Sequence, residues 1–217
     1  MTDKTKLTGV AALGFAALIV LGNAVLVPAG LPTPGTGAAE ALAFFGSQRD
    51  LVAAVTVVLP LAWVASTVFA AGALAALWSA DRVWALVGFA GVVLQNAVFS
   101  VVIALRLALA GEGATGGLWR LHDVLIAFNG TFLALALVGF TLGGRRAGLV
   151  RRWHAAVGLT GAALLFAGAT LAPWVTAEQG PLSLVGLAGW LLWAVWLGVY
   201  GVTLLRGRIT AASPVAA

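Results

Sequence analysis

The sequence predicts an all-α, polytopic membrane protein: a bundle of six transmembrane helices. Of the 217 residues, 62% are hydrophobic and only 9% are charged, whereas an average soluble domain is about 45–50% apolar and about 25% charged. So few charges cannot cover a water-facing surface, which excludes a soluble globular enzyme and a disordered chain. The chain also contains no cysteine, which excludes a disulfide scaffold and a cysteine nucleophile.

Six apolar runs are long enough to span a membrane. Crossing about 30 Å of hydrocarbon takes roughly 20 helical residues, and a helix satisfies its own backbone hydrogen bonds in lipid. The runs lack the alternation of polar and apolar residues that a membrane β-barrel requires. We therefore expect one membrane domain over residues 1–209, followed by a disordered tail at 210–217, with helices at about 7–27, 51–78, 83–110, 118–142, 153–172 and 182–205.

Short segments rich in polar residues, glycine or proline separate the runs. Ser79–Arg82 predicts a tight turn, Gly143–Arg152 carries four arginines, and Pro173–Pro181 is bounded by prolines, which are typical of loops. The longest connection, Pro28–Asp50, should begin as irregular chain. Its middle part, Ala38–Phe45, is expected to form a short interfacial helix.

The distribution of lysine and arginine predicts how the chain is oriented, because cytoplasmic loops are enriched in these residues. The side that carries the N-terminus has nine of them: Lys4, Lys6, Arg82, Arg145, Arg146, Arg151, Arg152, Arg206 and Arg208. The opposite side has Arg49, with Arg106 and Arg120 near helix ends. We therefore expect both termini in the cytoplasm and an uncleaved first helix rather than a signal peptide.

Polar side chains within the runs are candidates for a functional site, because such residues are costly in a bilayer. Helical spacing places Gln95 and Arg106 on one stripe, and His122 and Asn129 on one face of the next helix. We expect a polar pocket open to the outer side and floored by Gln95, Asn96 and Asn129. The candidate catalytic residues are Asp123, His122 and Asp50, and the candidate substrate-binding residues are Arg106, Arg120, Asn129, Gln95, Asn96 and Asn23.

These residues also have structural interpretations. Arg106 could extend to the headgroups from its position near a helix end. Arg120 and Asp123 could form an ion pair at a helix start, and Asn96 could serve only to link two helices. His154, which follows two arginines, is expected to be a solvated cytoplasmic residue.

The sequence gives no sign of a metal or cofactor. The two histidines are expected on opposite sides of the membrane, so they cannot share a multi-histidine metal site or a haem. Nucleotide-binding and hydrolase motifs are absent. The net charge of +5 is explained by membrane orientation, so no nucleic-acid partner is expected. The expected partners are membrane lipids and a lipophilic small molecule, and the oligomeric state stays open.

Two resemblances carry further expectations. The pair Leu121-His122, and the turn Gly143-Gly144-Arg145…Leu149…Arg152 followed by Val157-Gly158-x-x-Gly161, resemble a group of small bacterial six-span membrane proteins with a domain of unknown function. That resemblance implies the fold and a location in the bacterial cytoplasmic (inner) membrane, and it supplies no catalytic residues. In size and helical class the chain is also similar to membrane-bound terpene cyclases, which use acidic residues within the bundle. This chain has no acidic residue in its last run.

Three functions are compatible with these patterns. The favoured one is a membrane-embedded enzyme with cyclase- or isomerase-like acid–base chemistry on an isoprenoid or other lipophilic substrate. Asp123 or Asp50 would be the acid or base, His122 a relay, and Arg106 and Arg120 the anion or headgroup binders. The alternatives are a small-solute transporter or channel, and a non-catalytic scaffold. The enzyme is favoured because the polar residues are not expected to continue into the inner half of the bundle.

Overall fold

The computed structural model describes residues 3–206. Within this range the chain is entirely helical, without a β-strand, as the sequence predicts. Its elements are α1 (Asp3–Leu26), α2 (Ala38–Ser47), α3 (Arg49–Thr56), α4 (Leu59–Leu77), α5 (Arg82–Leu109), α6 (Gly116–Arg146), α7 (Arg152–Thr170), α8 (Ala172–Val175) and α9 (Ser183–Leu205). The tail predicted at residues 210–217 lies outside the described residues.

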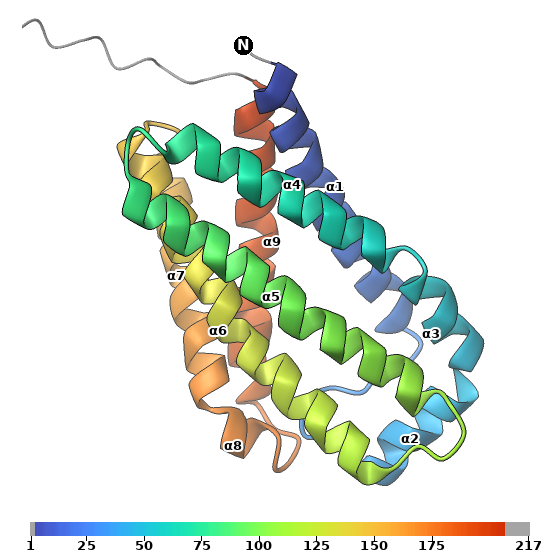
Figure 1. The fold of residues 1–217 in the computed structure, drawn as a ribbon. Helices are drawn as coiled ribbons and strands as arrows, with labels where there is room; N and C mark the ends of the chain where they lie inside the picture. Colours follow the sequence, from blue (N-terminus) through green and yellow to red (C-terminus); the bar gives the residue numbers. More distant parts are fainter. Residues whose placement is uncertain (1–2, 207–217) are drawn as a thin grey trace, which may run out of the picture.

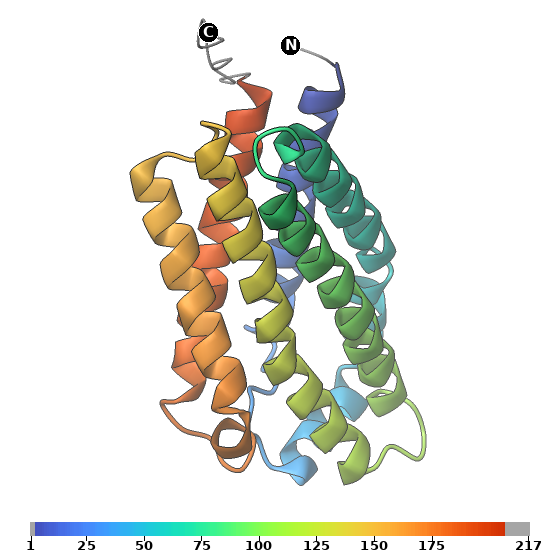
Figure 2. The same ribbon diagram turned by 60° about the vertical axis from the view of Figure 1, so that its left-hand side comes forward.

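Six helical segments of the described chain are long and apolar enough to cross a membrane, so the protein is a multi-pass membrane protein. They are α1, α3 together with α4, α5, α6, α7 and α9. Figure 1 and Figure 2 show them side by side in one bundle, with α5 against α6, α7 against α9 and α1 against both α4 and α9. The predicted fold class is therefore confirmed.

The second span differs from the prediction because it is broken. The first part, α3, ends at Thr56, and α4 begins at Leu59 with Pro60 in its first turn. Proline has no amide N–H and is disfavoured inside a helix, but it fits the first turn, where the N–H would have no partner.

A short helix is predicted at Ala38–Phe45, and α2 covers that range.

The fourth span is longer than predicted. Its helix continues past Leu142 to Arg146. Gly143 and Gly144 stay helical because their missing side chains let the neighbouring segments approach, and the two arginines that follow lie where a helix dipole favours cations. Arg146 pairs with Asp81, which also caps α5 by accepting a hydrogen bond from the Trp84 backbone N–H at 3.1 Å.

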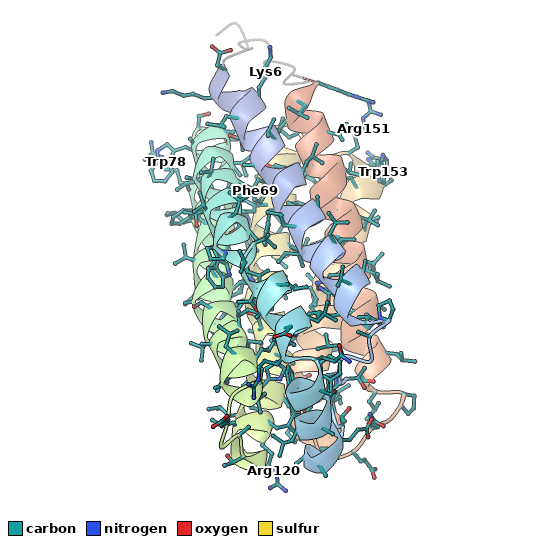
Figure 3. The ribbon with its side chains drawn as sticks, turned by 90° about the vertical axis from the view of Figure 1, so that its right-hand side faces the viewer. Lys6, Phe69, Trp78, Arg120, Arg151 and Trp153 are labelled. Atoms are coloured by element: carbon teal, nitrogen blue, oxygen red, sulfur yellow. The ribbon has the colours of Figure 1, made fainter. Side chains whose placement is uncertain are left out.

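The two ends of the bundle differ in charge. The end that holds the start of α1 and the end of α9, called here the basic end, carries the lysines and most of the arginines (Figure 2). Figure 3 shows Lys6 and Arg151 there, with Trp78 and Trp153 nearby, and Arg120 at the opposite end. That opposite end holds α2, α8 and the acidic residues Glu40, Asp50, Glu112 and Glu178.

Candidate functional site

A cleft of about 360 Å³ opens beside the first turns of α6, at the end of the bundle opposite the basic end. We call it the α6 cleft. Binding sites for small molecules commonly measure about 300–1,000 Å³, so this cleft is large enough for a ligand. It is formed by the loop after α1, one face of α6 and the segment after α8, and its lining residues are Gly35, Thr36, Gly37, Ala38, Trp119, Arg120, Asp123, Val124, Thr176 and Ala177.

The loop between α1 and α2, residues 27–37, forms one wall of the cleft and is called here the strap (Figure 1, the blue segment after α1). Its Gly35 has a positive φ of 84°, a conformation that favours glycine. Its backbone is also pressed against the end of α8, since a β-carbon on Gly35 would lie 2.7 Å from the Val175 carbonyl oxygen. Glycine is thus required at position 35 for two reasons: the backbone has a positive φ, and no space is left for a β-carbon.

Three hydrogen bonds of 2.9 Å or less hold the strap in place. The Gly35 backbone N–H donates to Asp123 Oδ2 at 2.9 Å, and the Trp119 indole N–H donates to the Thr36 carbonyl at 2.7 Å. Gln179 Nε2 donates to Thr36 Oγ1 at 2.6 Å. The strap therefore connects α6 with the chain before α9, and it closes one side of the cleft.

Asp123 is the acidic side chain of the cleft. It is only 3% exposed, and its second oxygen, Oδ1, is buried without a hydrogen-bond partner among the described residues. Arg120 lines the same cleft, but the one ion pair found in residues 3–206 joins Asp81 with Arg146. The proposed ion pair between Arg120 and Asp123 is therefore wrong, and neither group has an ion-pair partner among the described residues.

Arg106 and His122 form a buried pair beside the cleft rather than in it. Arg106 Nε donates to His122 Nε2 at 3.2 Å, and the two residues are 8% and 2% exposed. Because Nε2 accepts this bond, a neutral His122 ring carries its proton on Nδ1, which is buried and has no partner among the described residues. The His122 ring stacks on Trp119 at 5.1 Å, and Phe45 of α2 lies against its edge.

This geometry changes the role expected of two residues. Neither Arg106 nor His122 lines the α6 cleft. Asp123 accepts from Gly35 and has no described bond to His122, so the relay predicted between these neighbours is not formed. Successive residues point about 100° apart around a helix, which is why one faces the cleft and the other faces α5. Arg106 and His122 support the cleft through Trp119.

Three of the candidate residues lie away from the cleft. Asp50 is exposed on α3. The Asn23 side chain donates to the Ile19 carbonyl of its own helix at 2.9 Å. Asn96 exchanges hydrogen bonds with Ser66 at 2.8 and 3.0 Å, so it links α5 to α4, as its structural interpretation predicted.

The predicted floor of three amides is not part of the cleft. Gln95 is buried beside a separate, water-sized void of about 10 Å³ among apolar residues of the bundle interior. Asn129 is 5% exposed, and its Oδ1 has no partner among the described residues. The polar groups at mid-depth are therefore divided among several places instead of sharing one pocket.

A second polar cluster lies near the basic end, and the sequence argument missed it. His154 is 2% exposed, so the expectation of a solvated residue is wrong. Its Nε2 lies 3.0 Å from the Trp196 carbonyl, which can only accept, so this nitrogen carries a proton. The Thr141 hydroxyl, the Trp196 indole and the Tyr200 hydroxyl are buried without partners among the described residues. We call Thr141, His154, Trp196 and Tyr200 the His154 cluster.

One sequence signal could have placed His154 inside. It lies four residues before Gly158, so the two share a face of α7. Gly158 packs against both Thr141 and the Trp196 indole, where a β-carbon would collide. A glycine with bulky neighbours marks a packed face, and a histidine on that face is buried with it.

Comparison of the chain with protein-family models, with curated proteins and with solved structures gave no match. The resemblances to proteins with a domain of unknown function and to terpene cyclases therefore stay predictions. The α6 cleft is the feature that carries information about function, because it combines a space of ligand size with a buried, unpaired carboxylate oxygen.

Proposed function

We propose that the protein is a membrane-embedded enzyme that holds the polar part of a lipophilic molecule in the α6 cleft and uses Asp123 for acid–base chemistry. The observation that carries this proposal is the state of the Asp123 carboxylate. One oxygen is held by the Gly35 N–H, which fixes the orientation of the group. The other oxygen, Oδ1, is buried without a partner among the described residues in a side chain that lines the cleft. In the proposed reaction this oxygen takes a proton from the substrate or returns one.

The apolar surface of α6 fits an amphiphilic substrate. Val124 lines the cleft, and the exposed Phe128 follows four residues later on the same face of the helix. The polar part of a substrate can occupy the cleft while its apolar part extends along this face into the lipid. An isoprenoid or another lipid has this character.

The proposal is tested with the purified protein in nanodiscs supplied with an extract of bacterial lipids and isoprenoids. Mass spectrometry before and after incubation should reveal a product. Asp123→Asn should lower its rate by about 100-fold or more, the usual effect of losing a general acid or base. An asparagine can still accept from Gly35, so the strap should stay in place. The control is Glu112→Gln, at an exposed acid of the same end.

A small-solute transporter is the second candidate, and the His154 cluster favours it. Buried polar groups continue from Asp123 through Asn129 to Thr141 along α6. The half of the bundle near the basic end is therefore less apolar than the sequence predicts. Cysteines introduced at Leu133 and Leu137 separate the two functions. Reaction of either with a small thiol reagent from the basic end would favour transport, and protection of both favours the enzyme.

We further propose that the α6 cleft faces outward and that the basic end lies in the cytoplasm of a bacterial cell. The charge difference between the two ends supports this orientation. Because the native chain has no cysteine, single cysteines can be labelled cleanly. Glu112→Cys should react with an impermeant maleimide in intact cells and Ser79→Cys should not, since both positions are exposed and lie at opposite ends. The reverse pattern would invert the orientation.

A further inference from the structure

Most polar groups around the α6 cleft are already occupied. The Trp119 indole N–H binds the Thr36 carbonyl, and the Thr36 hydroxyl donates to the Thr33 carbonyl at 2.7 Å. The Thr176 hydroxyl donates to the Ala172 carbonyl at 2.9 Å, within its own short helix. These groups already have hydrogen-bond partners within the protein, so they contribute little to the recognition of a ligand.

Two side chains of opposite charge remain. Asp123 Oδ1 is an acceptor without a partner among the described residues, and the Arg120 guanidinium is a set of donors with no hydrogen bond or ion pair in residues 3–206. A ligand that satisfies both must carry a donor, preferably cationic, and an anionic group. Residues three apart on a helix have β-carbons about 5–6 Å apart, so one small ligand with both groups can reach both side chains.

The start of α2 adds to the anionic side of the cleft. Gly37 and Ala38 line the cleft, and α2 begins there without a side-chain cap. The first N–H groups of a helix have no intrahelical partner and attract anions. Arg120 and this helix start are thus both suited to an anion, while Asp123 is suited to an ammonium or hydroxyl group.

We propose that the α6 cleft binds a zwitterionic phospho-amine headgroup, with the phosphate near Arg120 and the start of α2 and a primary ammonium on Asp123 Oδ1. This inference rests on the proposed function and names its substrate class. A primary ammonium can donate to Asp123, whereas the quaternary ammonium of a choline headgroup cannot. The same chemistry is found in phosphatidylethanolamine and in soluble phosphoethanolamine.

The test compares lipids on the delipidated, detergent-purified protein by native mass spectrometry. Phosphatidylethanolamine should bind about tenfold more tightly than phosphatidylglycerol or phosphatidylcholine, because both of these lack the primary ammonium that donates to Asp123. Asp123→Asn should remove this preference. Arg120→Gln, which weakens the phosphate contact common to the three lipids, should lower all three affinities together. Arg151→Gln, at the basic end, and Glu112→Gln should keep the preference. Equal binding of the three lipids to the native protein, a preference that survives Asp123→Asn, or affinities that Arg120→Gln leaves unchanged would overturn the inference.

A second arm identifies the source of the headgroup. Soluble phosphoethanolamine is added to the complex with phosphatidylethanolamine. Displacement at equal concentration supports a soluble zwitterion as ligand, and lack of displacement supports the lipid. Circular dichroism and a single elution peak show that each variant is folded.

The two proposals can fail separately. If Asp123→Asn abolishes turnover but leaves lipid preference unchanged, the headgroup inference falls and the acid–base function stands. If the preference depends on Asp123 and the affinity depends on Arg120, but no product forms from phosphatidylethanolamine or the lipid extract, the headgroup inference stands and the enzymatic function falls.

Discussion

The α6 cleft and the His154 cluster lie toward opposite ends of α6, and both contain buried polar atoms that have no partner within residues 3–206. At the cleft, the Asp123 carboxyl group adjoins a space of about 360 Å³ walled partly by loop residues. In the His154 cluster, aromatic rings fill the surroundings: Trp196 lies 4.8 Å from Tyr200 and 5.3 Å from His154. An unpaired buried polar atom thus indicates a ligand site only where space adjoins it.

The backbone explains why one region is open and the other is filled. Around the His154 cluster, α6, α7 and α9 meet at glycines, so their neighbours approach closely. A β-carbon on Gly158 would lie 2.7 Å from the Trp196 ring, and one on Gly144 would lie 2.5 Å from a methyl group of Val150. At the cleft, a β-carbon on Gly37 would meet nothing within 4 Å. The following predictions test this difference.

The largest expected effect on stability is that of His154→Ala. The substitution removes a ring from a packed aromatic cluster and a hydrogen bond between α7 and α9. We expect a loss of about 3 kcal/mol in the free energy of unfolding, measured by denaturation in detergent, and unchanged lipid binding at the cleft. His154→Phe, which keeps a ring, should recover most of the loss. A stable His154→Ala protein would mean that the cluster is not packed as described.

A matched pair of glycines gives the next effect. Gly158→Ala should cost about 1–3 kcal/mol, because the added methyl group overpacks the contact with Trp196. Gly37→Ala should leave stability within about 0.5 kcal/mol, since its methyl group enters the open cleft. The same methyl group should weaken ligand binding. Equal destabilisation by both substitutions would contradict the contrast between a filled and an open region.

His122→Ala should have a moderate effect. It removes the ring that stacks on Trp119 and leaves Arg106 Nε without its acceptor. We expect a loss of about 1–2 kcal/mol in stability, together with weaker binding at the cleft, because Trp119 also holds the strap. Hydrogen exchange of the strap amides should increase. Unchanged exchange would show that His122 does not act through Trp119.

The smallest effects are expected from Thr141→Val and Tyr200→Phe. Each removes a hydroxyl that has no partner among the described residues while it keeps the shape of the side chain. Replacing an unsatisfied buried hydroxyl by an apolar group should change stability by less than about 0.5 kcal/mol or raise it. A loss well above this value in both variants would indicate that the cluster binds water or another ligand, and the comparison with the cleft would no longer hold.

The fold could be predicted because membrane crossing is governed by length and apolar composition, which are local properties of the sequence. The errors concern features that depend on neighbours. Gly143 and Gly144 are typical of loops and predict that α6 ends at Leu142, whereas the packing of adjacent segments keeps both residues helical. The break before α4 occurs at Pro60, although the sequence predicts one continuous helix across this residue.

The candidate site was predicted in part. Asp123 and Arg120 line the cleft because residues three apart share a helix face, which the sequence does show. The bond between Asp123 and Gly35 could not be foreseen, since it joins residues 88 positions apart through an irregular loop. The charged neighbours of His154 in the sequence predict a solvated side chain. Its burial is instead determined by the face of α7 that it shares with Gly158.

The strap has a consequence for the order in which the chain is made. A nascent chain emerges from its N-terminus, and domains form as synthesis proceeds. Thr36 is made early, but its partner Gln179 follows 143 residues later, after α7 and α8 have been made. Until then the strap has only its hydrogen bonds to α6, and the cleft lacks the wall that Thr176 and Ala177 form. A partly synthesised chain therefore has no complete ligand site, so binding begins only once the bundle is nearly finished.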